Sequence, residues 1–439
     1  MNWRPYPKYK DSGTNWLGQI PKHWEIQRLK WVLSIISGST PSSGVPEHWD
    51  GEIPWVTPSD LGKLRADTIT STERSITQEG YQSCGTTMVS GGSLVLSTRA
   101  PIGHLAIAGT DLCTNQGCKA LVFRKNDSDR YFYYQLLAGR AELQSHGCGS
   151  TFQELGRDAL ASVSLVRPPV SEQRAIAAFL DRETERIDTL IAKKERQIEL
   201  LREKRAALIS HAVTKGLDPN APMKDSGVEW LGKIPAHWEA KKIKRLSKVR
   251  RGASPRPIDD PVYFDDEGEY AWVRISDVTA STKYLLKTEQ ILSKLGKSKS
   301  VPLEPGEVFL SIAATVGKPI ITQIKCCIHD GFVYFIGLEQ HREYLFYLFS
   351  GGGLYQGLGK QGTQLNLNTE TIGDIQIPLP PFHEQRAIAA FLDREAGRID
   401  ALVGKVQGSI ETLREYRTAL ISAAVTGKID VRQEGGDGF

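Results

Sequence analysis

The chain has 439 residues, which is too long for one hydrophobic core of ordinary size and favours two to three domains. Hydrophobic residues make up 40% of it and charged residues 24%, and no segment approaches the roughly 18 consecutive apolar residues of a membrane span. A net charge of +4 does not by itself indicate a nucleic-acid partner. The N-terminus has no apolar core of the signal-peptide kind and the six cysteines show no framework spacing, so we expect a cytoplasmic protein without disulfides.

The first segment with a recognisable pattern begins at Lys10, and it occurs twice. Residues 10–32, KDSGTNWLGQIPKHWEIQRLKWV, return at 224–246 as KDSGVEWLGKIPAHWEAKKIKRL, identical at 13 of 23 positions. A longer segment at 172–218 returns at 384–430, identical at 31 of 47 positions. Because the offsets of 214 and 212 residues are nearly equal, the sequence predicts a tandem duplication with a period of about half the chain, which excludes short solenoid repeats.

Between the repeated segments lie two variable regions, 33–171 and 247–383, which align only in patches such as 38–41 with 252–255. Apolar runs at 93–96 and 308–312 predict buried strands, while 129–146 and 339–349 predict helices. We therefore expect each variable region to be a small α/β (α+β) domain. One scaffold with two different sets of loops is what reading two different targets requires.

The longer repeat predicts a long helix in each copy. Proline pairs at 168–169 and 380–381 precede the repeats, and Ser171 is a good candidate for an N-cap. Gly216 and Gly427 lie where the helices should stop, since glycine tolerates the left-handed conformation of a C-terminal cap.

Both predicted helices carry a heptad seam in the same frame, interrupted in the first copy by Lys194 and Arg205. The apolar seam positions are Ile187, Ile191, Ile198, Leu201, Leu208, Ile399, Val403, Val406, Ile410, Leu413 and Leu420. We expect the two helices to pair within the chain as an antiparallel coiled coil with pseudo-twofold symmetry. The alternative is a coiled coil that merely dimerises with another protein. A seam from 187 to 212 would span ~39 Å at ~1.5 Å per residue, close to the ~34 Å of one DNA turn.

A basic run follows the second copy of the short repeat. Residues 240–258 contain eight lysines and arginines and no acid: Lys241, Lys242, Lys244, Arg245, Lys248, Arg250, Arg251 and Arg256. Such a run can neutralise backbone phosphates, but a solvated surface stretch explains it equally well.

The duplicated motifs carry a family resemblance over essentially the whole chain. They are EQRAIAAFLD at 172 and 384, WLGQIPKHW at 16, WLGKIPAHW at 230, and a Gly-[Ser/Ala]-[Thr/Ser]-Pro start to each variable region. In this order, with unalike regions between, the pattern resembles the specificity subunits of type I restriction-modification systems.

The resemblance implies two target-recognition domains, at about 20–170 and 235–380, each reading one half of a bipartite, asymmetric DNA site. The long helices would set the spacer between the halves. The repeated regions would dock two adenine methyltransferase (modification) subunits, with restriction and translocase subunits completing a phage-defence enzyme. S-adenosylmethionine, ATP and Mg would belong to those partners, with no cofactor bound by this chain and no membrane partner.

These observations predict five segments. They are a first recognition domain at 1–170, a central helix at 171–218, a second recognition domain at 219–382, a C-terminal helix at 383–430 and a tail at 431–439.

Two other functions are possible alternatives. A DNA methyltransferase would need an Asn/Asp-Pro-Pro-aromatic motif to hold the target amine, and LPPF at 379–382 lacks the polar first residue. A coiled-coil adaptor without DNA recognition is the other alternative, and it would tolerate exchange of either variable region. Cys113 with Cys118, and Cys326 with Cys327, give no zinc spacing, so we predict no catalytic residue and no metal site.

Direct reading of bases requires polar or basic side chains on exposed loops, although the same residue types also serve as ordinary surface or capping residues. The candidates in the first domain are Thr40, Ser42, Arg99, His104, Asn115, Gln116 and Lys119. Those in the second are Arg251, Arg256, Arg274, Lys318, His329, Lys360, Gln361 and Gln364.

Overall fold

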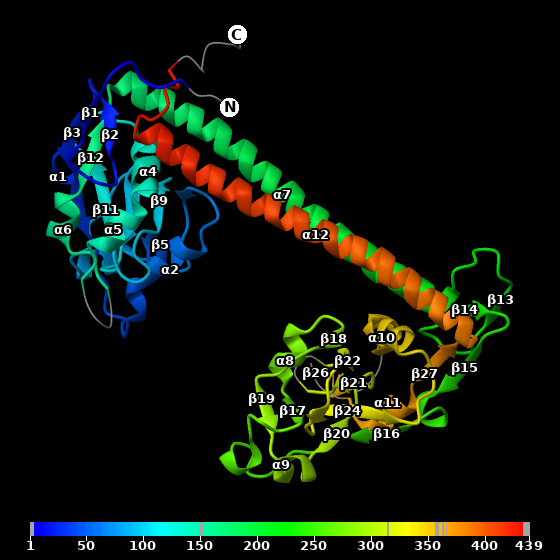
Figure 1. The fold of residues 1–439 in the computed structure, drawn as a ribbon. Helices are drawn as coiled ribbons and strands as arrows, with labels where there is room; N and C mark the ends of the chain where they lie inside the picture. Colours follow the sequence, from blue (N-terminus) through cyan, green and yellow to red (C-terminus); the bar gives the residue numbers. More distant parts are fainter. Residues whose placement is uncertain are drawn as a thin grey trace. The chain divides into compact units, whose positions relative to one another are not determined.

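The computed structural model describes residues 4–148, 153–313, 316–355, 360–361, 364–365 and 367–432. The chain forms two compact units (Figure 1). Unit 1 comprises residues 1–194 and 408–439, and unit 2 comprises residues 195–407. Both long helices contribute a part to each unit, so each unit contains one globular domain and two helix segments.

The globular domain of unit 1 is built on a five-stranded sheet with the order β4-β11-β8-β9-β6. Its strands are β4 (Leu33–Ser37), β11 (Cys118–Phe123), β8 (Leu94–Ser97), β9 (Leu105–Ala108) and β6 (Thr68–Ile69). Neighbours are antiparallel except for β6 and β9. A second sheet has the order β10-β5-β7, with β10 (Cys113–Thr114), β5 (Trp49–Val56) and β7 (Ser75–Ile76). Strand β8, predicted at 93–96, is buried along its whole length.

Short helices surround these sheets. They are α1 (Leu29–Val32), η1 (Pro46–His48), α2 (Pro58–Lys63), α3 (Gln78–Ser83), α4 (Asp129–Ala138), α5 (Arg140–Ser145) and α6 (Arg157–Ser162). Thr57 and Asp60 form a capping box that starts α2, and Ser128 caps α4. The helix predicted at 129–146 is two helices, because the chain breaks at Gly139, which ends α4 and precedes α5. The remaining strands are β1 (Tyr9–Asp11), β2 (Gln19–Pro21), β3 (Glu25–Arg28) and β12 (Ser164–Arg167).

The globular domain of unit 2 repeats this strand order. Its five-stranded sheet runs β16-β24-β21-β22-β18, with β16 (Lys248–Arg251), β24 (Phe332–Ile336), β21 (Val308–Ser311), β22 (Pro319–Thr322) and β18 (Tyr284–Leu285). A four-stranded sheet runs β19-β17-β23-β20, with β19 (Gln290–Leu292), β17 (Tyr270–Val273), β23 (Cys326–Ile328) and β20 (Val301–Leu303). In both domains the chain visits the five main strands in the same order, so the unalike variable regions share one scaffold.

The other elements of unit 2 are short. Its helices are η2 (Ile243–Arg245), η3 (Pro261–Tyr263), α8 (Ile275–Ala280), α9 (Lys294–Ser298), α10 (Arg342–Ser350), η4 (Gly352–Tyr355) and α11 (Thr369–Asp374). Its remaining strands are β13 (Met223–Asp225), β14 (Lys233–Pro235), β15 (Glu239–Lys242), β25 (Lys360–Gln361), β26 (Gln364–Leu365) and β27 (Gln376–Leu379).

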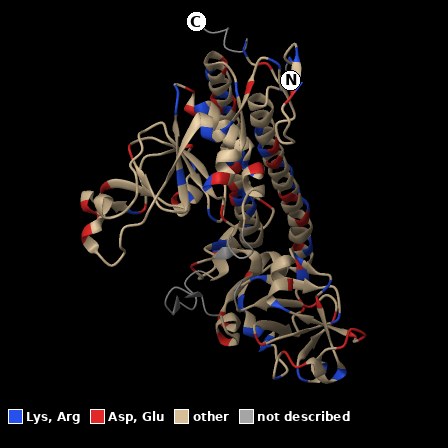
Figure 2. Cartoon of the chain, turned by 90° about the vertical axis from the view of Figure 1, so that its left-hand side faces the viewer, with Lys and Arg blue, Asp and Glu red and all other residues tan. Residues whose placement is uncertain are grey.

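The two long helices are α7 (Val170–Lys215) and α12 (Phe382–Val425). Ser171 is not the N-cap of α7, because the helix begins one residue earlier, directly after the proline pair at 168–169. Gly216 and Gly427 follow the helix ends with φ of +76° and +70°, a conformation that glycine adopts without strain. Acidic and basic residues are interspersed along the long helices (Figure 2).

The repeated tryptophan segment packs against helix ends. In unit 1 the indole of Trp24 donates to the Glu172 carboxylate at 2.8 Å, and His23 lies 2.8 Å from the same carboxylate. A Cβ at Gly427 would lie 2.3 Å from Pro21 and 3.0 Å from Trp24. The start of α7 and the end of α12 therefore meet on one buried tryptophan.

Unit 2 contains the equivalent junction. Trp238 donates to Glu384 at 2.9 Å and His237 lies 2.7 Å from it, while a Cβ at Gly216 would lie 3.2 Å from Trp238. The start of α12 and the end of α7 thus meet on the second tryptophan.

Within each unit the two helix segments pack on each other. In unit 1, Ile187 of α7 shares a core with Leu420 of α12. In unit 2, Ala212 of α7 shares a core with Leu392 of α12. None of the predicted seam positions in either helix is exposed, and most of the positions between them are.

The two arginines of the seam are paired with acids of the opposite helix. Arg417 of α12 lies 3.0 Å from Asp188 of α7 in unit 1, and Arg205 of α7 lies 2.9 Å from Asp400 of α12 in unit 2. Lys194 has an apolar counterpart, Val406, in the second copy, and both side chains are half-buried.

Candidate nucleic-acid interface

One end of the first domain's five-stranded sheet gathers several of the predicted contact residues. Strands β4 and β8 end there and β9 and β11 begin there, because these neighbours are antiparallel. The hydroxyl of Thr40, which follows β4, donates to the side chain of Gln116, which precedes β11. Arg99, which follows β8, lies 3.2 Å from Glu154. Thr40, Arg99 and Gln116 are all exposed, so this end presents polar and basic side chains to solvent.

The other candidates of the first domain are placed less uniformly. Ser42 is exposed on the loop after β4, and Asn115 accepts a hydrogen bond from the backbone of Gly117 at 2.9 Å. His104, at the start of β9, is half-buried, and its pKa is lowered by burial and by the charge of Arg140. These three residues line the same end of the sheet as Thr40.

Lys119 does not lie on an exposed loop as predicted. It is part of β11, which is paired on both sides by β4 and β8, and only 8% of the residue is exposed. Burial lowers the pKa of its ammonium group. The local sequence is typical of a polar turn, and only the sheet pairing shows that Lys119 belongs to β11.

In the second domain the same end of the sheet is organised around Asp330. Arg256 lies 3.1 Å from its carboxylate, Ser254 donates to that carboxylate at 3.0 Å, and Arg251 donates to its backbone carbonyl. Asp330 was not predicted as a site residue, since a lone aspartate in a turn has no distinguishing pattern. It holds the two candidate arginines, Arg251 and Arg256, beside each other at the exposed end.

The remaining candidates of the second domain have structural contacts of their own. The ring of His329 packs 4.4 Å from that of Phe332, its Nδ1 accepts from Gly331 at 2.8 Å, and burial lowers its pKa. Lys318 donates to the backbone of Thr279 at 3.1 Å, and Arg274 precedes α8. The side chains of three further candidates lie outside the described residues: Lys360, Gln361 and Gln364.

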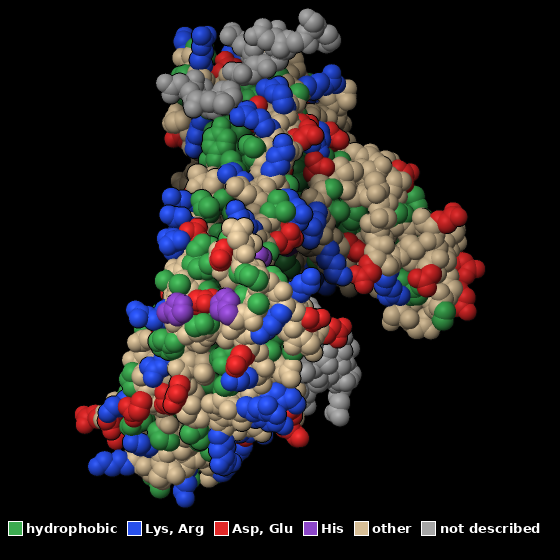
Figure 3. All heavy atoms as spheres, turned by 90° about the vertical axis from the view of Figure 1, so that its right-hand side faces the viewer, with side chains coloured by type: hydrophobic (Ala, Val, Ile, Leu, Met, Phe, Trp, Pro, Cys, Tyr) green, Lys and Arg blue, Asp and Glu red, His purple; other side chains and the backbone are tan. Residues whose placement is uncertain are grey.

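The basic run divides into two parts. Lys242 and Lys244 both pair with Asp374, at 2.9 and 2.7 Å, so the first part fits the interpretation as a charge-balanced surface. Lys248 and Arg250 are exposed on β16, an edge strand, and neither has an ion pair among the described residues. On the face in Figure 3, basic and acidic side chains are interspersed.

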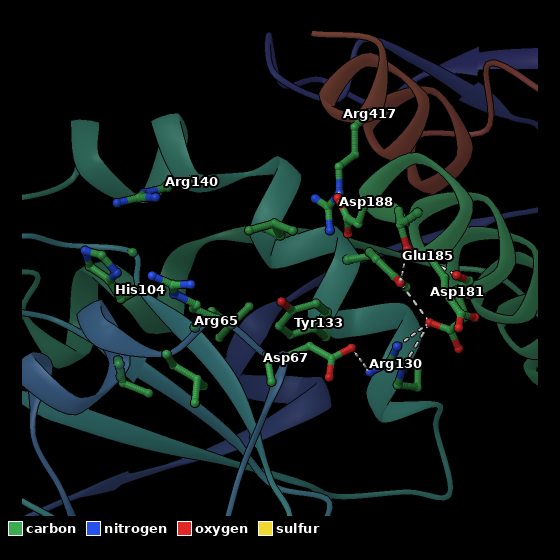
Figure 4. Close-up of a pocket in the computed structure, with 18 of the residues that line it drawn as sticks. Arg65, Asp67, His104, Arg130, Tyr133, Arg140, Asp181, Glu185, Asp188 and Arg417 are labelled. Atoms are coloured by element: carbon green, nitrogen blue, oxygen red, sulfur yellow. Dashed lines mark hydrogen bonds and ion pairs between the residues drawn. The ribbon is translucent and has the colours of Figure 1, made fainter. Parts of the chain in front are cut away.

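A cavity of about 770 Å³ in unit 1 lies between the globular domain and α7 (Figure 4). Arg65, His104 and Arg140 line one side of it. The acids Asp67 and Asp181 on its other side are bound by Arg130. Arg65 and Arg140 have no ion pair within the described part of the chain, and neither does the acid Glu185, which also lines the cavity. Sequence reasoning missed both arginines, because neither lies in a motif.

The described part of the chain contains neither a metal-binding cluster nor a membrane-spanning helix. No group of three or more His, Cys, Asp or Glu side chains there could hold a metal ion, and no described helix is long and apolar enough to cross a membrane. All six cysteines are free thiols.

Comparison with known families bears directly on these two domains. The family model of the type I restriction modification DNA specificity domain matches residues 21–200 and 235–407. The chain belongs to this family. It is a specificity subunit, the non-catalytic component that determines which DNA a type I restriction-modification enzyme recognises, and most of each globular domain falls within one of the two matches.

Curated relatives agree with this family. The chain is 33% identical to the type I restriction enzyme MjaIX specificity subunit of Methanocaldococcus jannaschii, over 57% of this chain and 57% of that relative. It is 24% identical to the MjaVIII specificity subunit of the same organism, over 94% of this chain and 95% of the relative.

Two solved structures share the fold. One is a chain of a type I R-M system studied for complex assembly and conformational transition, with a TM-score of 0.73 at 16% identity, covering 92% of this chain and 98% of that one. The other is the HsdS subunit from Thermoanaerobacter tengcongensis, with a TM-score of 0.54 at 17% identity, covering 93% and 98%.

Proposed function

We propose that this specificity subunit reads a bipartite, asymmetric DNA site with one globular domain for each half. The observation that carries the proposal is that both domains have the same strand order but unalike loops at the same end of the sheet. A shared scaffold places each loop set in the same way, and different side chains on the loops select different bases.

In this proposal the exposed candidates around Thr40, Arg99 and Gln116 read one half-site, and those around Asp330 read the other. Arg65 and Arg140 in the first domain, and Lys248 and Arg250 in the second, bind phosphates, because a cation without a counterion gains most from a phosphate. The limits proposed for the two recognition domains are those predicted from the sequence, residues 1–170 and 219–382.

We further propose that α7 and α12 form one antiparallel coiled coil, related to itself by a pseudo-twofold axis, which sets the spacer between the half-sites. Two ion pairs support this. Arg417 is the repeat counterpart of Arg205, and Asp400 is that of Asp188, each at the offset of 212 residues. Arg205 pairs with Asp400 and Arg417 with Asp188, so a single antiparallel register with twofold symmetry accounts for both contacts.

The partners proposed are double-stranded DNA, two adenine methyltransferase subunits docked on the repeated regions, and restriction or translocase subunits. S-adenosylmethionine, ATP and Mg would be bound by those subunits, and the assembly would act in the cytoplasm. The duplication supports two equivalent docking sites for the methyltransferase, since each junction of tryptophan and helix end occurs twice.

Mapping of adenine methylation in a genome tests this function. Cells would express the methyltransferase partner with or without this chain. A split motif that is methylated only when the chain is present is the expected result. Exchange of residues 33–171 for another recognition domain should then change one half of the motif and leave the other. Absence of any motif from a folded complex would favour the adaptor, and a change in both halves would contradict the one-domain, one-half-site assignment.

A further inference from the structure

The globular domain of each unit is held to its long helix at equivalent positions. Tyr131 of α4 and Tyr344 of α10 correspond, since each hydroxyl donates to the last turn of a long helix, at Val425 and Val213 respectively. One turn later, Tyr134 and Tyr347 donate to Asp181 and Asp393, at 2.7 and 2.6 Å.

The acids that receive these tyrosines belong to the identical FLDRE sequence of the two repeats. Asp181 and Asp393 are therefore the same residue in the two copies, on α7 and α12. Each lies on the helix face toward its own globular domain, where it also meets a cation from that domain.

In unit 1 the cation is Arg130, on the first turn of α4. It donates from Nε to Asp181 at 3.0 Å and from another nitrogen to Asp67, which precedes β6 (Figure 4). Arg130 thus connects the helix acid to the edge strand of the five-stranded sheet.

In unit 2 the charges of the two domain residues are exchanged. The position of Arg130 is occupied by Glu343, and the position of Asp67 by Lys283, because the backbone carbonyls of Asp67 and Lys283 accept from the equivalent strand residues Ile107 and Ile321. Lys283 itself reaches Asp393, at 2.5 Å. Glu343 accepts instead from Tyr284 at 3.3 Å, and its carboxylate also lies 3.3 Å from Nδ1 of His341.

The equivalent helix acids, Asp181 and Asp393, are therefore each neutralised by a cation, but the cation comes from a different position in each domain. Where Arg130 is replaced by an acid in unit 2, Asp67 is replaced by a lysine. Two unalike variable regions thus both bring a cation to the same helix acid. The paired groups are about one-third exposed in unit 1, where ion pairs add little net stability. Their main effect is geometric, because a cation bound between two carboxylates fixes a direction.

We propose that Asp181 with Arg130 and Asp67, and Asp393 with Lys283, are positioning residues that fix the orientation of each recognition domain on its helix and thereby select the spacer length of the DNA site. This inference rests on the proposed reading of a split site. A domain that rotates about its tyrosine contacts would present its loops at a different distance from the other half-site.

The test uses the full chain in complex with its methyltransferase. Methylation rates are measured on DNA carrying the mapped site with its native spacer and with spacers one base pair shorter and longer. Arg130→Glu places three acids together and should lower the preference for the native spacer by about tenfold, since a misplacement of about 1 Å costs that much or more. The double variant D67K/R130E copies the charges of unit 2 and should restore the preference.

The control is Arg186→Glu, because Arg186 is exposed on α7 and, among the described residues, its ion pair is with Glu183 of the same helix. It should leave the spacer preference unchanged. Reciprocal variants test unit 2. Glu343→Arg should by itself have little effect on the spacer preference, and K283D/E343R should retain that preference. The inference would be overturned if Arg130→Glu lowered the methylation rate by the same factor on all three spacers. It would also be overturned if D67K/R130E did not restore the preference for the native spacer. A wild-type complex without any spacer preference would instead overturn the proposed function itself.

Discussion

At the scale of single residues, a glutamate in each unit explains why each short repeat contains a histidine directly followed by a tryptophan. Glu172 accepts from Trp24 at 2.8 Å and from Tyr6 at 3.3 Å, and its side chain is 10% exposed. Burial and the adjacent Glu172 charge raise the pKa of Tyr6, so this tyrosine stays a hydrogen-bond donor. Glu384 has the same role in unit 2, with 30% of its side chain exposed.

Replacement of Glu172 by Ala should lower the free energy of unfolding by about 2 kcal/mol, because the buried donors of Trp24 and Tyr6 lose their acceptor. Glu384→Ala should cost less, since water can reach that site. Denaturant unfolding followed by tryptophan fluorescence measures both variants. Equal losses would contradict the difference in burial.

At the scale of elements, each long helix has one buried face and one exposed face. Ile410 of the seam is 1% exposed, whereas Leu402 on the same helix is 49% exposed. The seam therefore accounts for the stability of α12, while its outer apolar side chains contribute little.

Ile410→Ala should lower the free energy of unfolding by about 3 kcal/mol, as expected for a large side chain removed from a core. Leu402→Ala on the same helix should change it by about 0.5 kcal/mol or less. Thermal unfolding of the two variants compares them directly. A larger loss for Leu402→Ala would mean that the other face of the helix is the packed one.

The cavity between the globular domain of unit 1 and α7 gives a second prediction at this scale. If Arg65 and Arg140 bind phosphates, the double variant R65A/R140A should weaken binding to all DNA sequences alike. The slope of log affinity against log salt should become shallower by about 2, since each phosphate contact contributes about 0.9. Arg182→Ala with Arg186→Ala, whose arginines pair with Glu183, serves as the control. A change in the sequence read, with an unchanged slope, would contradict the phosphate role.

At the scale of the whole molecule, the proposed spacer depends on helix length. Insertion of one heptad into both α7 and α12, at equivalent places near residues 196 and 408, keeps the seam in frame and adds ~10 Å at ~1.5 Å per residue. The methylated motif should then gain about three base pairs in its spacer, at ~3.4 Å for each. Methylation mapping gives the answer. An unchanged spacer would show that the helices do not measure the distance.

Much of this architecture could be predicted from the sequence, because it depends on local or repeated patterns. The two long helices and their glycine stops follow from periodicity, and the family follows from the resemblance that the repeated motifs carry. The buried side of each helix follows as well, since a heptad pattern specifies which side is apolar, whereas the coiled coil that the pattern predicts remains a proposal. Even so, Ser171 is not the N-cap, and the helix predicted at 129–146 is broken at Gly139.

The site was decided by the tertiary structure. Lys119 reads as a turn residue but lies within a paired strand, and Arg65 and Arg140 face one cavity although 75 residues separate them. Asp67, Arg130 and Asp181 come from a loop, a short helix and a long helix. No local pattern encodes such meetings, because they depend on how distant segments pack. The sequence by itself determined the repeated framework, and packing alone determined which polar side chains of the variable regions face each other.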